Sequence, residues 1–248
     1  MFNWNDLYIG YLNLDHRKDR LDHMKEELKR VGIVAERTRG KLPTEYDLSD
    51  SKLQVMNTRT KGAIACHYGQ VEIMQKGLDE NKSVMVLEDD VVFCDDLKER
   101  LNIIQDFLSE NNWDIFWLGG THHKEPTWHK SINGVHSHSD LKMCDCNLNR
   151  DWEETDNPYI VRTFGIWSTY AYIVNKNSIE KILRLLEENV HLSMGIDWLM
   201  ILLQPRLNTF CFNPGCVKQI DNQSDIGRGV TVFSNFEKLG NHWFAEKI

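Results

Sequence analysis

Three consecutive carboxylates, Glu88, Asp89 and Asp90, directly follow the uncharged run at residues 83–87. Such a run is typical of a strand buried on both faces of a parallel sheet, and ligands of open α/β sheets bind at the carboxyl ends of the strands. Alternate residues of an extended segment point to the same side, so Glu88 and Asp90 can reach one site and offer oxygen ligands to Mg²⁺ or Mn²⁺. A metal held there could bridge a diphosphate. The alternative is a solvated acidic turn that caps the next helix.

A second polar cluster, at residues 13–20, comes at the end of the first expected strand and begins with Asn13. Arg17 and Arg20 share one face of the helix expected there. The planar guanidinium group suits a phosphate, so this face could bind one. The alternative is an amphipathic helix that turns its charged face to water.

Two further polar residues stand in apolar surroundings. His67 falls on an apolar helical stripe, where a neutral core histidine is the more frequent outcome and a role beside a ligand or metal is the alternative. Asp197 interrupts an apolar stretch. It is either a helix cap, which the preceding Gly195 favours, or an acid or base in a cleft.

Weaker signals come from the middle and the end of the chain. The three histidines and two cysteines in residues 129–146 have spacings that match no standard zinc finger or ribbon, so zinc is disfavoured. Asp221, Asp225 and His242 could return to the metal edge. Nothing local distinguishes them from loop residues.

Strands and helices must alternate to place these side chains. Apolar runs predict strands at 7–14, 33–37, 83–87 and 114–118, and residues spaced by three or four predict the helices between them. Asp15 is the expected N-cap of the first helix, and Gly32 is its expected C-terminal residue. This alternation predicts a Rossmann-like α/β fold with a mostly parallel central sheet flanked by helices. Further strands near 159–174 and helices at 177–186 and 196–203 complete one expected domain over 1–248, interrupted by a long variable loop at about 121–158.

The composition limits the classes of partner and compartment. With 29 Lys and Arg against 37 Asp and Glu, the net charge is −8, which makes nucleic acid a poor partner. No apolar run approaches the roughly 18 residues that a membrane span needs, and the start of the chain lacks a signal peptide pattern, so we expect a cytoplasmic protein. The six cysteines include no Cys-x-x-Cys pair and are expected to be free thiols.

Several motifs, taken in order, resemble glycosyltransferase family 25, the lipopolysaccharide-biosynthesis type of transferase to which collagen galactosyltransferase domains are related. Residues 9–20 resemble the opening strand and arginine-bearing helix of that family, and residues 86–91 resemble its acidic metal motif, the most specific match. Further matches are the helix at 62–67, the strand at 168–174, the pair Ile196 and Asp197, and the closing element at 223–226. Two departures are Cys66, where the family often has serine, and residues 119–158, which contain no recognisable motif.

The resemblance implies a GT-A fold, a UDP-sugar donor and usually manganese, with magnesium as the other option. It implies transfer of a hexose, galactose or glucose, to a hydroxyl acceptor with inversion, and Asp197 as the base. The acceptor could belong to a glycan, a lipid-linked saccharide or a protein, and peripheral membrane contact is compatible with it. The metal ligands implied are Glu88, Asp90 and Asp225, and the implied donor-binding residues are Asn13, Arg17, Arg20, Gly62, His67, Glu88 and Asp89.

Two other functions compete with this interpretation. A metal-dependent phosphohydrolase would also place carboxylates after a buried strand, but Glu88 stands where its aspartyl nucleophile is expected. A catalytically silent carbohydrate-binding or assembly protein could keep the same fold. It would bind saccharides without affinity for UDP and manganese.

Overall fold

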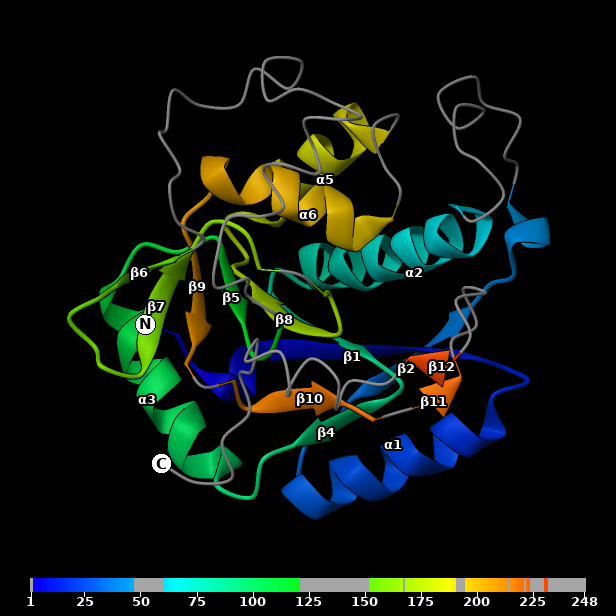
Figure 1. Ribbon diagram of the computed structural model, residues 1–248, viewed down its shortest axis with the longest axis horizontal. Coiled ribbons are helices and arrows are strands. Elements are labelled where there is room, and N and C mark those ends of the chain that lie inside the picture. The colour runs from blue at the N-terminus through cyan, green and yellow to red at the C-terminus, as the bar shows by residue number, and fades with distance from the viewer. Residues whose placement is uncertain are drawn as a thin grey trace.

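The computed structural model of the chain describes residues 2–46, 60–120, 152–166, 168–190, 195–213, 215–220, 222–223 and 230–231. Its main sheet has eight strands (Figure 1). Their order is β2 (Glu36–Gly40), β1 (Leu7–Leu14), β3 (Ser83–Glu88), β8 (Ala171–Val174), β5 (Ile115–Trp117), β9 (Thr209–Phe212), β7 (Ile160–Thr163) and β6 (Trp152–Glu154). Two small antiparallel sheets pair β4 (Val91–Phe93) with β10 (Val217–Gln219) and β11 (Asn222–Gln223) with β12 (Val230–Thr231).

Most strands of the main sheet run in one direction. β1 is parallel to β2 and β3, and β5 is parallel to β9. β8 is antiparallel to β3 and β5, and β7 is antiparallel to β6 and β9. Only β8 and β7 therefore run against the other strands of this sheet, so the predicted mostly parallel sheet is confirmed.

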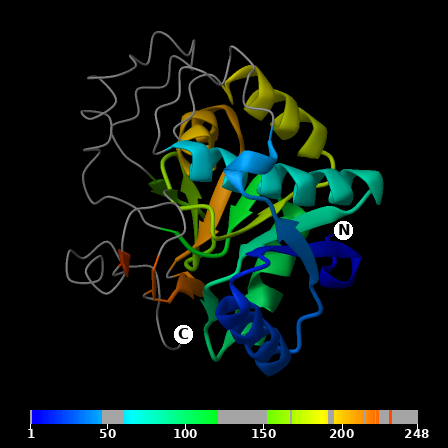
Figure 2. The same cartoon turned by 90° about the vertical axis from the view of Figure 1, so that its right-hand side faces the viewer.

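Helices cover both faces of this sheet. α2 (Thr60–Asp79), α5 (Ile179–Glu188) and α6 (Ile196–Leu203) lie on one face, and α1 (Lys18–Val31) and α3 (Leu97–Glu110) lie on the other (Figure 1). The view turned by 90° shows α2, in cyan, and α1, in blue, on opposite sides of the strands (Figure 2). Short 3-10 turns occur at Trp4–Asp6, Pro43–Glu45 and Gln204–Arg206. The predicted Rossmann-like α/β fold is confirmed by this arrangement.

The uncharged run before the acidic motif is buried on both faces, as predicted. Val84 and Val86 of β3 pack in the core under α2, α5 and α6, whereas Met85 and Leu87 pack in the core on the other face. All four side chains are at most 1% exposed. Burial of each such side chain contributes roughly 1.5–3 kcal/mol relative to exposure, so β3 is firmly held and its end is a rigid support.

The start of the chain differs in two details from the prediction. The second strand is Glu36–Gly40 and not 33–37, because α1 ends at Val31 with Gly32 as its C-cap (φ 72°), and the next three residues connect without strand pairing. The N-cap of α1 is Arg17 and not Asp15. The Asp15 carboxylate instead accepts hydrogen bonds from Arg37 and Arg39 on β2.

Strands from the second half of the chain form the part of the sheet from β8 to the edge strand β6, together with β5. β8 enters between β3 and β5, so the strand that follows β3 in space comes from more than 80 residues later in the sequence. β6 lies within the range 121–158 that was expected to be a loop, and residues 121–151 fall outside the described residues. In the part of the chain that the structure describes, no helix has the length and apolar character needed to cross a membrane.

Candidate active site

The acidic motif lies at the carboxyl end of β3, beside the end of β1. The parallel register pairs Leu12 of β1 with Glu88, which leaves Asn13 next to the motif. The Asn13 side chain is buried, and its Nδ2 donates a hydrogen bond of 2.7 Å to Asp89 Oδ2. Arg37 donates to Asn13 Oδ1 at 3.0 Å and so fixes which end of the amide faces Asp89. The structure therefore brings Asn13 and the acidic motif together.

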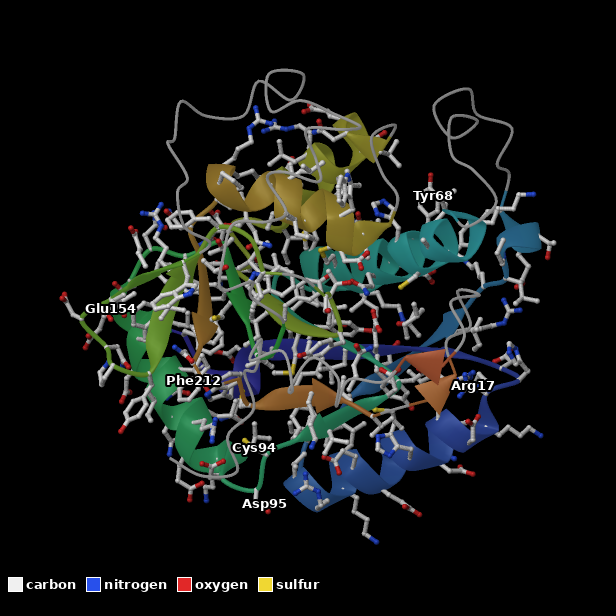
Figure 3. The ribbon with its side chains drawn as sticks, viewed as in Figure 1. Arg17, Tyr68, Cys94, Asp95, Glu154 and Phe212 are labelled. Atoms are coloured by element: carbon white, nitrogen blue, oxygen red, sulfur yellow. The ribbon has the colours of Figure 1, made fainter. Side chains whose placement is uncertain are left out.

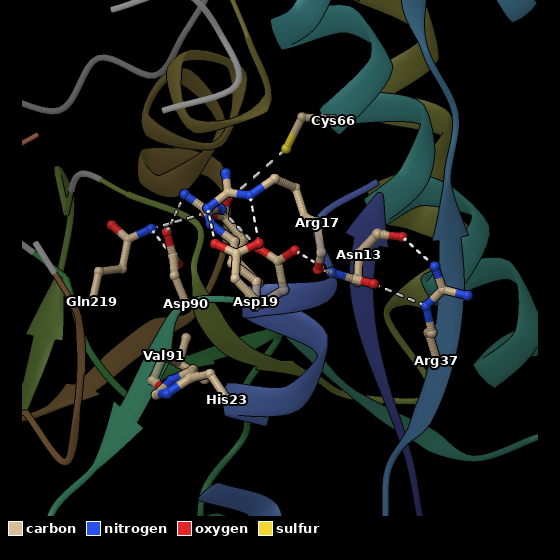
Figure 4. Close-up of polar contacts among 12 residues, drawn as sticks. Asn13, Arg17, Asp19, His23, Arg37, Cys66, Asp90, Val91 and Gln219 are labelled. Carbon is tan, nitrogen blue, oxygen red and sulfur yellow. Dashed lines mark hydrogen bonds and ion pairs between the residues drawn. The ribbon is translucent and has the colours of Figure 1, made fainter. Parts of the chain in front are cut away.

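The carboxylates of the motif differ in their hydrogen-bond partners, and Figure 4 shows Gln219 beside Asp90. Asp89 accepts hydrogen bonds from Asn13 and Arg20. Glu88 Oε2 and Asp90 Oδ1 both accept from the Nε2 atom of Gln219, at 2.9 and 3.0 Å. Glu88 and Asp90 thus reach one point in space, whereas Asp89 is held by Asn13 and by Arg20, which also pairs with Asp90.

Burial and mutual repulsion disfavour negative charge on this pair. Desolvation raises the pKa of Glu88 well above its ordinary value, and the charges of Asp90 and Asp197 add to the increase. Desolvation also raises the pKa of Asp90, although Arg20 and Gln219 act in the opposite direction. A bound cation would remove this penalty, because it would offset both negative charges at once.

Arg20 and Arg17 lie at the start of α1, next to the motif. Arg20 Nη1 is 2.7 Å from Asp89 Oδ1, and its Nη2 is 3.3 Å from Asp90 Oδ2. Arg17 pairs with Asp19 at 2.8 Å, and this contact lowers the pKa of Asp19 to about 2. Both guanidinium groups are at the predicted edge of the sheet. A diphosphate arriving there would have to share them with these carboxylates.

The side chains of α2 that touch the motif are Cys66 and Gln70. Gln70 is fully buried and its Nε2 donates to Glu88 Oε1 at 3.2 Å, while Cys66 Sγ lies 3.9 Å from the same oxygen. Burial, together with the charge of Glu88, raises the pKa of the Cys66 thiol, so this group stays protonated. The residue that departs from the family pattern is therefore in contact with the acidic motif.

His67 and Gly62 occupy other positions on α2. The His67 ring packs edge-on against the ring of Tyr68, whose side chain points away from the sheet (Figure 3). Burial lowers the pKa of His67 to about 4, and its Nδ1 has no hydrogen-bond partner among the described residues. This uncharged, enclosed ring has the environment of a core histidine. Gly62 lies in the first turn of α2, partly buried.

Asp197 lies in the first turn of α6, on the same face of the sheet as α2. The N-cap of α6 is Gly195, whose φ is 149°, so the capping position that Asp197 could have taken belongs to glycine. A Cβ on Gly195 would lie 2.9 Å from Asp197 Oδ1 and 3.3 Å from the Ala63 side chain, which shows how tightly α6 begins against α2. The charge of Asp197 raises the pKa values of Glu88 and Cys66. Asp197 and the acidic motif therefore belong to one electrostatic site.

Gln70 and Gln219 were not predicted, and they are the two amides that hold Glu88. Gln70 could have been found, because it lies one helical turn after Cys66 in a helix that was predicted to face the core. Gln219 gave no local signal. It reaches the motif because β10 pairs with β4, and that pairing brings it next to Asp90.

Two carboxylates are available for a divalent cation in the described structure. Glu88 and Asp90 fit such an ion, because one amide nitrogen already bridges their oxygens and both pKa values are raised. No group of three or more His, Cys, Asp or Glu side chains suited to a metal occurs among the described residues. Asp225, together with Asp221, His242 and the histidines and cysteines of 129–146, lies outside them.

Solved structures and one family model show similarity to this chain. The solved structure of mouse xyloside xylosyltransferase 1 in its apo form is 11% identical with a TM-score of 0.43, covering 83% of this chain and 71% of that one. Mannose-1-phosphate geranyltransferase from Thermus thermophilus is 8% identical with a TM-score of 0.40, covering 84% and 73%. No curated protein matches the chain. The sequence model described as glycosyltransferase family 25 (LPS biosynthesis protein) matches residues 8–200, and the chain therefore belongs to glycosyltransferase family 25.

Proposed function

We propose that this glycosyltransferase moves a hexose, galactose or glucose, from a UDP-sugar to a hydroxyl acceptor, with inversion and with Mn²⁺ or Mg²⁺ as cofactor. The observation that carries the proposal is the pair of mutually repelling carboxylates, the half-buried Glu88 and the buried Asp90, bridged by one donor at the end of β3. The GT-A fold expected of the family puts its donor site at this edge of the sheet. The mostly parallel, helix-covered sheet supports that expectation.

The residues of the proposed donor site have different roles. A cation held by Glu88 and Asp90, with Asp225 as a further ligand, would neutralise the charge that builds on the departing diphosphate. Asn13 and Asp89 hold the end of β1 against the motif through their 2.7 Å hydrogen bond. Arg17 and Arg20 contribute positive charge on the α1 side. Gly62 and His67, on α2, complete the proposed donor site.

Asp197 is the proposed base. Transfer with inversion needs one group to take a proton from the incoming hydroxyl, and a carboxylate can do so when it lies beside the reacting centre. Asp197 is partly buried at the start of α6 and close enough to Glu88 to raise its pKa. Its position across the site from α1 leaves the acceptor hydroxyl to approach from the side of α2 and α6.

The acceptor is the least constrained part of the proposal. We propose that residues 1–248 act as one glycosyltransferase domain and that residues 121–158 select the acceptor, which would be a glycan, a lipid-linked saccharide or a protein hydroxyl. These residues contain no motif of the family. Exchanging the segment with that of another family member would then change the acceptor and leave donor hydrolysis intact.

The first test is a donor screen that measures UDP release with Mn²⁺, with Mg²⁺ and with EDTA. We expect slow hydrolysis of UDP-galactose or UDP-glucose in the presence of Mn²⁺, and loss of at least ~90% of that rate in EDTA, because the cation offsets leaving-group charge. Phosphate release from simple phosphate esters, with no sugar transfer, would favour the phosphohydrolase. Saccharide binding without any affinity for UDP and Mn²⁺ would favour the silent carbohydrate-binding protein.

The second test follows from the raised pKa values of Glu88 and Asp90. Because their pKa values in the folded protein lie above the unfolded values, this pair destabilises the metal-free protein increasingly as pH rises from the unfolded pKa through the folded one. Protons also compete with Mn²⁺ for the pair over the same range. We therefore expect Mn²⁺ at about 100 times its Kd to raise the melting temperature by roughly 5–10 °C near pH 8, and by much less near pH 5. An equal increase at both pH values would contradict metal binding by this pair.

A further inference from the structure

One side-chain nitrogen occupies the point where Glu88 and Asp90 converge. Nε2 of Gln219 donates to Glu88 Oε2 at 2.9 Å and to Asp90 Oδ1 at 3.0 Å. Figure 4 shows the nitrogen of Gln219 turned towards Asp90 and its oxygen turned away. A neutral amide at this point satisfies both carboxylates in part, but it cannot neutralise them.

The backbone holds Gln219 in this place. β10 pairs with β4 so that Gln219 is opposite Val91, and the N–H of Ile220 donates to the carbonyl oxygen of Asp90 at 2.9 Å. At the other end of β10, a Cβ on Gly119 would collide with the carbonyl oxygen of Val217, so only glycine permits the observed approach. The position of Gln219 therefore depends on strand pairing, independently of its contacts with the carboxylates.

Gln70, the second glutamine at the motif, differs from Gln219 in the hydrogen bonding of its side-chain oxygen. Gln70 Oε1 accepts a hydrogen bond of 2.9 Å from the Tyr172 hydroxyl, and its Nε2 also contacts Thr169. These buried contacts fix the orientation of the Gln70 amide. Among the described residues, no group donates a hydrogen bond to the oxygen of Gln219, so rotation of its amide by 180° breaks no bond at the oxygen end.

Rotation of the amide would exchange a donor for an acceptor of nearly the same shape. A divalent cation between Glu88 and Asp90 repels N–H groups and attracts a carbonyl oxygen, and glutamine carbonyls are ordinary ligands of hard cations. We propose that Gln219 is a cation-responsive ligand: its nitrogen bridges the carboxylates in the metal-free protein, and its Oε1 turns to the cation when one binds. This inference rests on the proposed metal-dependent function and adds a ligand that the family motif does not supply.

The direction in which Gln219→Met changes the affinity for Mn²⁺ distinguishes a ligand role from a competing or a purely structural one. We would titrate the purified full chain with Mn²⁺ and measure free Mn²⁺ by electron paramagnetic resonance, with no sugar donor present. Gln219→Met removes the amide at similar length, and we expect it to weaken Mn²⁺ binding by about 10-fold or more. If the amide only competes with the cation, Gln219→Met will tighten binding, and if it is only a structural contact, the Kd will not change. Either result would overturn the proposal.

Two further variants keep the test decisive. Gln219→Glu puts a carboxylate oxygen at the same reach, and we expect it to bind Mn²⁺ at least as tightly as the wild type; weaker binding would count against an oxygen ligand at this position. Gln75→Met is the matched control, because Gln75 also donates to a carboxylate, that of Asp79, but on the exposed side of α2. Its Mn²⁺ affinity should equal that of the wild type.

The visible absorption spectrum of bound Co²⁺ supplies a second measurement that does not depend on activity. A change of ligand set alters this spectrum, so Gln219→Met should shift it while Gln75→Met should not. If the wild type binds Mn²⁺ and the Gln219 variants match it in Kd and spectrum, the inference fails and the proposed function stands. If the wild type binds no divalent cation at all, the metal dependence of the proposed function fails first.

Discussion

Asp90→Asn is expected to lower kcat/KM for sugar transfer by roughly 10³-fold, equivalent to about 4 kcal/mol of transition-state stabilisation. The substitution keeps the shape of the side chain but replaces one of the two charged carboxylates of the proposed cation site with a neutral amide. It also removes the charge of one of the two carboxylates that pair with Arg20 in the motif. Initial rates of UDP release and Mn²⁺ titration on the same preparation would measure both consequences.

The matched control for this variant is Asp95→Asn. Asp95 is 82% exposed, pairs with Arg30 on the surface, and points away from the body of the protein (Figure 3). Exposed ion pairs contribute about 0–1 kcal/mol, so this change should leave transfer within about twofold of the wild type. If Asp90→Asn retained transfer within tenfold and bound Mn²⁺ normally, the acidic motif would not be the cation site.

Asp197→Asn is expected to lower kcat by about 10²- to 10⁴-fold while leaving KM for the donor and the Kd for Mn²⁺ nearly unchanged. The amide keeps the shape of the carboxylate but cannot take a proton from the acceptor hydroxyl. Because the charge of Asp197 raises the pKa of Glu88, its removal should also let Mn²⁺ binding persist to slightly lower pH. Steady-state kinetics with a hydroxyl acceptor, followed by the pH dependence of Mn²⁺ binding, would test both effects.

Glu99→Gln is a suitable control for Asp197→Asn. Glu99 is an exposed carboxylate in the first turn of α3, so the change removes the same favourable interaction with a helix N-terminus, worth roughly 0.3–1 kcal/mol, away from the site. We expect normal kcat for this variant. Wild-type turnover in Asp197→Asn would instead show that the base is another residue.

The fold of the first half could be predicted because its signals are local. The charge-free run before Glu88, the apolar spacing in α1 and α2, and Gly32 after α1 each depend on neighbours within a few residues. A small error came from groups on the next strand, more than 20 residues away. Asp15 is a good capping residue by type, but two arginines on β2 hold its carboxylate.

The site was predicted less completely, because it joins segments that are far apart in the chain. Glu88, Asp89 and Asp90 could be recognised from three adjacent letters at the end of a buried run. The role of Gln70 requires a hydroxyl from Tyr172, which is 102 residues away. Donor binding by His67 stays a prediction, and its ring packs against Tyr68 with a pKa lowered by burial.

The sequence by itself determined the α/β class, the order of the early elements and the position of the acidic motif at the end of β3. Periodicity and composition along a short segment suffice for these features, since they set which faces of that segment are buried. Only the tertiary structure decided that β8 enters the sheet beside β3, that Asp197 shares an electrostatic site with Glu88, and that Gln219, 131 residues from Glu88, bridges the two carboxylates. Pairing between distant strands depends on the packing of the whole core, and no short stretch of sequence contains that information.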